Sequence, residues 1–298
     1  MNEIGSNEQP LIPQGWQRSL VFIPALVLSM LIGSSLGTFL YLSLPFADQS
    51  LAQSSLLSDP YFLLVSQTTV FLINLVVVWI FRKKIDNQSF QSLGFQWTRY
   101  GSDFAFGIGL GILLPLMALV LLRYMDVLYI KSFAFEWPRI IIGFFMLISV
   151  ALNEELIIRG YLLKNLMRSL QNWMALLITS VIFTIMHSWN PDISWIGVLN
   201  IFLAGLLMGV YYIKKQNLWF PIAFHLSWNF FQGPVFGFKV SGLPLQGILN
   251  HVLNGPTYLT GGNFGLEGSI ISVVFLSLAV VGVYFYYQDE DNISGRAF

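Results

Sequence analysis

Mostly apolar stretches alternate with short polar segments along the whole chain, and eight of the apolar stretches approach the length of a membrane span. A helix needs about 20 residues to cross the hydrocarbon core of a bilayer. We therefore predict an all-α, polytopic membrane protein with about eight transmembrane helices. The predicted spans are residues 19–43, 61–81, 103–123, 139–163, 172–188, 194–213, 218–236 and 268–287.

The polar segments between the predicted spans are too short to fold as independent domains. The two longest are residues 82–102 and 237–267, and the Gly and Pro residues of the second indicate an irregular loop. The sequence thus predicts one transmembrane domain between two tails. The predicted boundaries are 1–18 for a cytoplasmic tail, 19–288 for the transmembrane domain and 289–298 for a second cytoplasmic tail.

Composition supports this fold class and excludes several functions. The chain is 55% hydrophobic and 10% charged, whereas a soluble domain has about 25% charged residues. Its formal net charge is zero, so it lacks the basic surface that nucleic-acid binding requires. The chain contains no cysteine, which excludes disulfides, thiolate catalysis and cysteine metal ligands.

Basic residues are distributed unequally between the two sides of the predicted bundle. The side of the N-terminus carries the basic residues within 82–84, 164–168 and 214–215. The opposite side holds Arg123, Lys131, Arg139 and Lys239. Because cytoplasmic loops carry an excess of Lys and Arg, we predict that both termini are cytoplasmic.

Three predicted spans contain two glycines four residues apart. Small residues at this spacing allow two helices to approach closely in lipid, so we assign these glycines to helix packing. The pairs are Gly33 and Gly37, Gly107 and Gly111, and Gly205 and Gly209.

The fourth predicted span contains Glu154, Glu155 and Arg159. A charge at the bilayer centre costs about 2.5–3.5 kcal/mol on insertion scales, which favours a function. On a helix Glu155 and Arg159 share a face and can pair, whereas Glu154 points about 100° away from Glu155. A carboxylate left alone in a poorly solvated cavity can serve as a general base. The alternative is a span that ends at Leu152, with these residues in a hydrated flank.

His187 lies at the far end of the fifth predicted span, four residues after Phe183. A polar cluster predicts the turn between the fourth and fifth spans near Leu170 and Gln171. Glu154 and His187 are each about 16 residues from that turn, or on the order of 24 Å along a helix. We therefore expect them to face each other at equal depth. The alternative is an interfacial histidine.

His225 and Asn229 are four residues apart in the seventh predicted span, so they lie on one helix face. Polar groups buried in lipid need partners. One interpretation places both side chains in the same site as Glu154 and His187. The alternative is a hydrogen-bonded pair that holds helices together.

Together these residues provide the groups needed to hydrolyse an acyl bond. Glu154 can activate a water molecule, His187 and His225 can hold it or transfer protons, and Asn229 can donate to an oxyanion. The same two histidines and Glu154 also match a catalytic zinc site with an open position. The His-Glu-x-x-His signature of many zinc enzymes is absent from the sequence. The cofactor is therefore either none or zinc.

Three motifs, in this order and on separate predicted helices, resemble those of a known family. They are Glu154-Glu155-x-x-x-Arg159, Phe183-x-x-x-His187 and His225-x-x-x-Asn229. The sequence is similar to the CAAX prenyl protease and bacteriocin-processing (CPBP or Abi) family of intramembrane proteases, which are relatives of the eukaryotic type II CAAX endopeptidase. The resemblance is most compact over residues 150–232.

The resemblance implies an intramembrane endopeptidase of the bacterial cell membrane, with a cavity between its helices. It implies that Glu154 is the base, that His187, His225 and Asn229 complete the site, and that Glu155 supports it or takes part directly. It further implies supporting roles for Arg159 and Phe183. The resemblance leaves glutamate-type and metalloprotease chemistry both open.

The implied partners are the lipid bilayer and a hydrophobic or lipidated peptide or protein, with no nucleic acid. An alternative function is a bacteriocin immunity, binding or regulatory protein that uses this fold without turnover. A second alternative is a proton-coupled transporter, because buried Glu and His also build proton relays. The inverted repeats and broken helices typical of transporters are not evident in the sequence.

Overall fold

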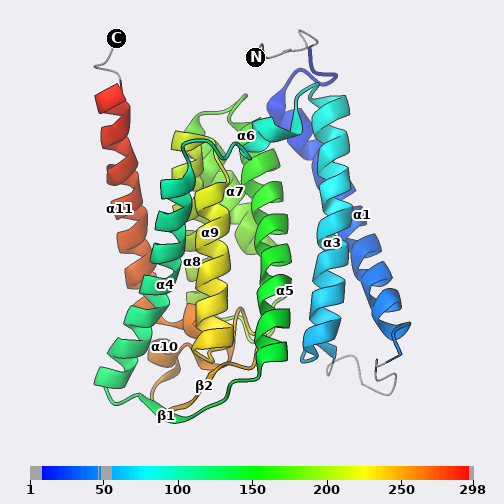
Figure 1. Cartoon of the computed structure of the whole chain (residues 1–298). Helices are drawn as coiled ribbons and strands as arrows, with labels where there is room; N and C mark the ends of the chain where they lie inside the picture. The colour runs from blue at the N-terminus through cyan, green and yellow to red at the C-terminus, as the bar shows by residue number, and fades with distance from the viewer. Residues whose placement is uncertain (1–8, 46, 48–55, 295–298) are drawn as a thin grey trace.

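Figure 1 shows the computed structural model as a bundle of long helices capped at one end by a short two-stranded sheet. The structure describes residues 9–45, 47 and 56–294. The long helices are α1 (Gly15–Leu42), α3 (Pro60–Ile80), α4 (Gly101–Tyr124), α5 (Trp137–Glu155), α7 (Asn172–Met186), α8 (Trp195–Lys215), α9 (Trp219–Phe230) and α11 (Ile270–Ser294). The shorter elements are η1 (Phe81–Ile85), η2 (Phe90–Leu93), β1 (Leu128–Phe133), η3 (Leu156–Leu163), α6 (Lys164–Leu166), η4 (Phe231–Val235), β2 (Leu249–Leu253), α10 (Thr257–Thr260), η5 (Gly262–Phe264) and η6 (Leu266–Gly268).

The predicted all-α, polytopic class is confirmed, but the count of eight transmembrane helices is not. Within the described residues, six helices are long and apolar enough to cross a membrane. The predicted spans 172–188 and 218–236 correspond to the shorter helices α7 and α9. Helix α1 begins at Gly15, before the predicted boundary at 19, and α11 continues to Ser294, beyond the predicted 288. Parts of both predicted tails, residues 1–8 and 295–298, lie outside the described residues.

Local sequence signals explain several of the helix boundaries. Helix α3 begins after Asp59, whose carboxylate accepts hydrogen bonds from the backbone N–H groups of Tyr61 and Phe62 at 2.7 and 2.9 Å. Helix α8 begins after Ser194, whose hydroxyl accepts from the N–H of Gly197. The turn predicted near 170–171 lies between the end of α6 and the start of α7.

The segments expected to be loops contain a two-stranded sheet that the sequence did not predict. Strands β1 and β2 are antiparallel and pair from Leu128 with Leu253 to Phe133 with Leu249. The segment 237–267, expected to be irregular, also contains α10 and η5. Both strands carry mixed polar and apolar residues without strict alternation, so period-two patterning gave no signal.

The glycine pairs pack helices together as predicted. A Cβ on Gly37 of α1 would lie 2.8 Å from the Cα of Ser66 in α3. A Cβ on Gly107 of α4 would lie 2.7 Å from the carbonyl oxygen of Phe220 in α9. Gly205 of α8 packs somewhat less closely against α7, where an added Cβ would meet Ser180 at 3.1 Å. At Gly37 and Gly107 only glycine therefore permits the backbone approach.

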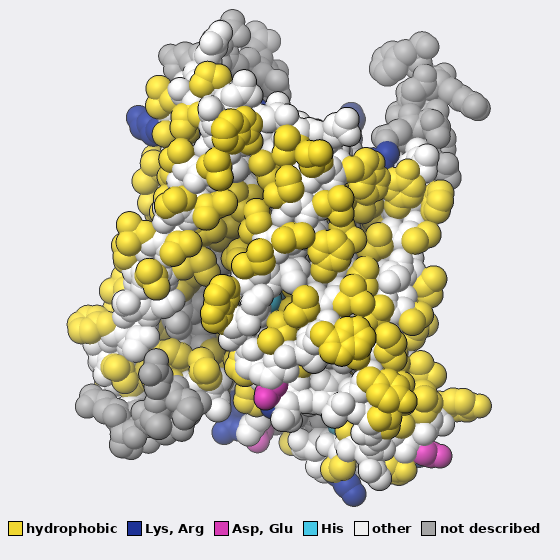
Figure 2. All heavy atoms as spheres, turned by 180° about the vertical axis from the view of Figure 1, so that it is seen from behind, with side chains coloured by type: hydrophobic (Ala, Val, Ile, Leu, Met, Phe, Trp, Pro, Cys, Tyr) yellow, Lys and Arg dark blue, Asp and Glu magenta, His cyan; other side chains and the backbone are white. Residues whose placement is uncertain are grey.

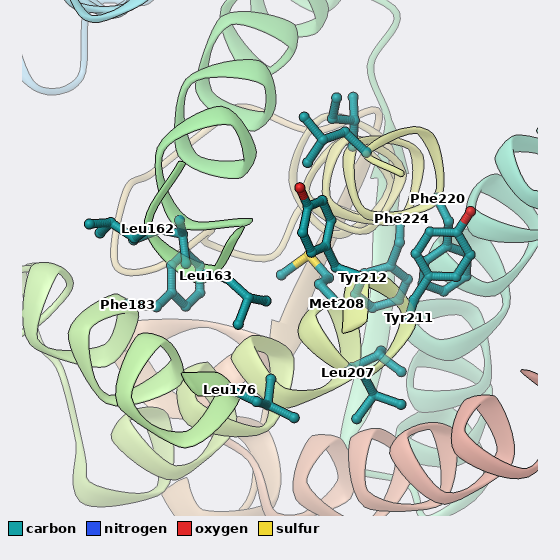
Figure 3. Packing of buried hydrophobic residues seen from close by; sticks show 14 of the residues in the cluster. Leu162, Leu163, Leu176, Phe183, Leu207, Met208, Tyr211, Tyr212, Phe220 and Phe224 are labelled. Atoms are coloured by element: carbon teal, nitrogen blue, oxygen red, sulfur yellow. The ribbon is translucent and has the colours of Figure 1, made fainter. Parts of the chain in front are cut away.

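The largest hydrophobic core lies where η3, α7, α8 and α9 meet. Figure 3 shows apolar and aromatic side chains of these four segments packed against one another. Phe183, Leu207 and Phe224 are each at most 3% exposed. Helix α9 contacts α4, α5 and α8, so a short helix in the middle of the bundle is surrounded by longer ones (Figure 1). This arrangement buries the segments that carry the three motifs.

The outer surface is that of an integral membrane protein. Figure 2 shows hydrophobic side chains covering one face, with basic side chains at both ends and acidic side chains at the lower end. Figure 1 shows that α1 begins and α11 ends at the same end of the bundle, opposite β1 and β2. An even number of crossings requires such an arrangement, whereas the cytoplasmic location of that end remains a prediction.

Candidate active site

The two glutamates of the first motif occupy the last turn of α5, directly before the helix widens. Residues 156–163 form the π-helical segment η3, where a regular α-helix was expected. π-Helical segments inside α-helices are rare and often mark functional sites. Adjacent residues of a helix point about 100° apart, so Glu154 and Glu155 have different surroundings.

Glu155 is completely buried and paired, as its spacing from Arg159 predicted. Its Oε1 accepts hydrogen bonds from Arg159 at 2.8 Å and from Nδ1–H of His225 at 2.9 Å. Arg159 is 1% exposed and also donates to the carbonyl oxygen of Gly205 at 3.2 Å. These residues are therefore not a hydrated flank, and the alternative of a span that ends at Leu152 is wrong.

Glu154 faces both histidines instead. Its Oε2 lies 3.6 Å from Nε2 of His187 and 3.9 Å from Nε2 of His225. Among the described residues this oxygen has no hydrogen-bond partner. The equal depth expected for Glu154 and His187 on neighbouring antiparallel helices is thus observed.

Hydrogen bonds fix the orientation of the two imidazole rings. Nδ1–H of His187 donates to the carbonyl oxygen of Phe183 at 2.8 Å, and Nδ1–H of His225 donates to Glu155. In a neutral imidazole the other nitrogen, Nε2, then carries the lone pair. Three acceptor atoms, one from Glu154 and one from each histidine, consequently converge on the same space.

The ring of Phe183 contacts three other side chains of the site. The guanidinium carbon of Arg159 lies 4.6 Å above the ring centroid, and the ring of His187 lies 4.6 Å away. Phe183 also makes an edge contact with His225 at 6.4 Å. A buried aromatic ring between a cation and two imidazoles holds all three in position.

A cavity of about 190 Å³ opens beside these residues and is lined by Glu154, His187, His225 and Asn229. Asn229 lies one turn after His225 in α9 and is 7% exposed. The structure therefore brings together all seven residues selected from the sequence, Glu154, Glu155, Arg159, Phe183, His187, His225 and Asn229. The cavity volume is several times that needed for a water molecule.

Sequence reasoning missed five further polar residues that line the cavity, Gln67, Asn190, Asn200, Ser241 and Glu267. Gln67 and Asn200 interrupt apolar spans, which was a usable signal because lone polar residues in a span need partners. Glu267 follows a Gly-rich loop with no helical or strand periodicity, so its position depends on tertiary structure alone.

The fit of a metal ion depends on the same three acceptor atoms. A carboxylate and two imidazoles whose Nδ1 atoms are hydrogen-bonded form a donor set that zinc accepts. However, no group of three or more His, Asp or Glu side chains among the described residues is arranged to hold a metal ion.

The fold and this cluster define a polytopic membrane protein with a buried glutamate–histidine site. Residues 136–231, which are 96 of the 298 residues, match the model of the type II CAAX prenyl endopeptidase Rce1-like family. The match confirms the resemblance to the CAAX protease family and supports an intramembrane peptidase. No curated protein and no solved structure matches the chain.

Proposed function

We propose that the protein is an intramembrane endopeptidase in which Glu154 activates a water molecule to hydrolyse a peptide bond. The observation that carries this proposal is the convergence of Glu154 Oε2 with Nε2 of His187 and of His225 beside a cavity. A water molecule in this space has acceptors for both of its hydrogens. Its oxygen is thereby directed into the cavity as a nucleophile.

The reaction is hydrolysis with internal proton transfer. Glu154 takes a proton from the water as the oxygen adds to the peptide carbonyl carbon. The carbonyl oxygen becomes an oxyanion, to which the side-chain amide of Asn229 donates a hydrogen bond. The carbon–nitrogen bond then breaks, and the leaving amine receives the proton from Glu154. The products are a carboxyl group and an amine.

Glu155 is unsuited to be the base because its charge is already compensated. Arg159 and His225 both donate to its Oε1, and its side chain is 0% exposed. Its role in the proposal is to fix the His225 ring so that Nε2 points towards Glu154. Arg159 balances the charge, and Phe183 supports Arg159 from below its guanidinium plane.

The proposed substrate is a hydrophobic or lipidated peptide or protein associated with the membrane. Apolar side chains, including Met146, Leu147 and Phe224, line the cavity around the polar cluster. The bundle surface is apolar between its ends (Figure 2), so a substrate embedded in lipid can approach without crossing water.

The test is cleavage of quenched hydrophobic and lipidated peptides by the purified protein in liposomes. Wild type is compared with Glu154→Gln, which keeps the side-chain shape and removes the base. Asp126→Asn is the matched control, because Asp126 is exposed, lies at the end of α4 and has a φ of 55° that Asn also tolerates. We expect loss of cleavage in Glu154→Gln alone, by about 100-fold or more.

Two further comparisons distinguish glutamate chemistry, metal chemistry and a binding function without turnover. Each variant is assayed with and without a chelator. A loss of wild-type cleavage on chelation would indicate metal-dependent hydrolysis and contradict the glutamate mechanism. Unchanged cleavage by a folded Glu154→Gln protein would refute the assignment of the base. If wild type cleaves none of the peptides and the Glu154→Gln protein keeps full biological activity, an immunity or binding protein is favoured over a protease.

A further inference from the structure

The loop before α11 forms one wall of the cavity and carries a second acidic group, Glu267. This carboxylate is 9% exposed and lines the same cavity as Glu154. Its Oε2 accepts hydrogen bonds from the N–H of Ser241 at 2.6 Å and from the hydroxyl of Ser241 at 2.8 Å. Glu267 lies outside residues 136–231, the segment that matches the protease family.

The loop adopts an unfavourable backbone conformation to provide these donors. Ser241 has a φ of 49°, in the left-handed region that side chains other than Gly and Asn rarely adopt. It sits in a tight turn in which Val240 and Leu243 exchange backbone hydrogen bonds at 3.0 and 2.9 Å. Strained residues of this kind cluster at binding sites, because the surrounding structure must hold them in place.

Asn200 of α8 adds a second acceptor to this wall. Its Nδ2 donates to the carbonyl oxygens of Glu267 and Ser269 at 2.6 and 3.0 Å, which fixes the orientation of the amide. Asn200 is 1% exposed and lines the cavity, yet its Oδ1 has no partner among the described residues. A buried acceptor without a donor is costly, so a ligand that supplies a donor gains free energy here.

Among the described residues, no lysine or arginine forms an ion pair with Glu267. Lys239, the nearest basic residue in the loop sequence, forms its ion pair with Asp192 at 3.5 Å instead. Burial raises the pKa of Glu267 above its usual value near 4.5, against the opposing effects of the Ser241 donors, His187 and Gln232. A cation that entered the cavity would therefore relieve an unfavourable burial of negative charge.

We propose that Glu267 and Asn200 form a subsite that binds a lysine or arginine side chain of the substrate peptide close to the bond that is cleaved. The carboxylate of Glu267 and Oδ1 of Asn200 are acceptors, so together they suit a group that carries only donors. An apolar side chain would leave Asn200 Oδ1 unpaired and the charge of Glu267 uncompensated, and an acidic side chain would be repelled. This inference rests on the proposed peptidase function and adds a preference for a basic residue.

The experiment compares quenched hydrophobic peptides that differ at a single position, lysine against norleucine, placed in turn on each side of the cleaved bond. For wild type we expect kcat/KM to be about tenfold higher for lysine at one position, as for one charge-assisted hydrogen bond. In Glu267→Gln the ratio of the two kcat/KM values should fall to about one. Asp126→Asn, which lies away from the cavity, should keep the wild-type ratio. An unchanged ratio in Glu267→Gln, or no preference in wild type, would overturn the subsite.

A binding measurement separates this subsite from the proposed function. Glu154→Gln is titrated with the lysine and norleucine peptides, alone and combined with Glu267→Gln. Tighter binding of the lysine peptide that disappears in the double variant supports the subsite even if wild type cleaves nothing, in which case only the peptidase function fails. Equal binding of both peptides refutes the subsite. If Glu267→Gln does not fold, Glu267→Asp replaces it. This variant should show a smaller preference for the lysine peptide, because the Asp side chain is one methylene shorter and its carboxylate reaches less far.

Discussion

Removing Arg159 should destabilise the protein more than any other single change at the site. Its guanidinium lies 2.8 Å from Glu155 Oε1, and the two side chains are 1% and 0% exposed. Arg159→Ala leaves a buried carboxylate without its cation. It also removes the hydrogen bond to Gly205 and the contact with the Phe183 ring.

The magnitude follows from the burial of both charges. Two unit charges at about 4 Å attract by about 4 kcal/mol at an effective dielectric constant near 20. Removing one partner of a buried ion pair typically costs about 3–5 kcal/mol. For a chain of this size that cost corresponds to a fall in melting temperature on the order of 5–10 °C.

A double-mutant cycle isolates the ion pair from the packing. Arg159→Met keeps most of the side-chain volume, and Glu155→Gln keeps an oxygen that accepts from His225. We expect Arg159→Met alone to melt lower by about the full amount, and the combination with Glu155→Gln to recover much of it, because no uncompensated charge remains.

The assay is thermal unfolding in detergent, followed by tryptophan fluorescence, together with peptide cleavage at a temperature where every variant is folded. Arg159→Met should also lower cleavage, since Glu155 would no longer hold the His225 ring in one orientation. An Arg159→Ala protein with unaltered melting and activity would refute the reasoning and mean that the pair is hydrated.

The remaining predictions concern helix packing and pH. Gly107→Ala should destabilise by about 1–3 kcal/mol, because the new Cβ would lie 2.7 Å from the Phe220 carbonyl oxygen. Gly109→Ala on the same helix has no atom within 4 Å of its Cβ and should melt like wild type or higher, so equal effects would contradict the close approach of α4 and α9. The raised pKa of Glu267 means that the folded state holds this proton more tightly than the unfolded state. Its contribution should therefore lower stability as pH rises from about 4.5 through the folded-state pKa. Melting of wild type and Glu267→Gln is compared between about pH 4 and pH 8, and a difference that does not grow with pH would show that the carboxyl is hydrated.

Much of the site was predictable because its motifs follow helical periodicity. The spacing of Glu155 and Arg159 predicted their pairing, and the turn near 170 placed Glu154 and His187 at one depth. Both relations are local, since one lies within a helix and the other across a single antiparallel connection. The helices were predictable for the same reason, because an apolar segment in lipid must satisfy its own backbone hydrogen bonds.

The contact between His225 and Glu155 joins residues 70 positions apart, and no local rule predicts it. It depends on how α9 is rotated against α5, which side-chain packing and the glycine contacts with α4 determine. The π-helical segment after Glu155, the pairing of β1 with β2, and the turn that holds Glu267 likewise have no periodic signal.

The sequence by itself therefore determined the membrane-spanning class, the positions of the helices, the three motifs and the relations within each helix or hairpin. Tertiary structure alone decided which histidine nitrogen faces which carboxylate, and that a distant loop adds Glu267 to the cavity. The physical reason is that helix formation depends on residues a few positions apart, whereas the rotation and lateral order of helices depend on contacts between segments far apart in the chain.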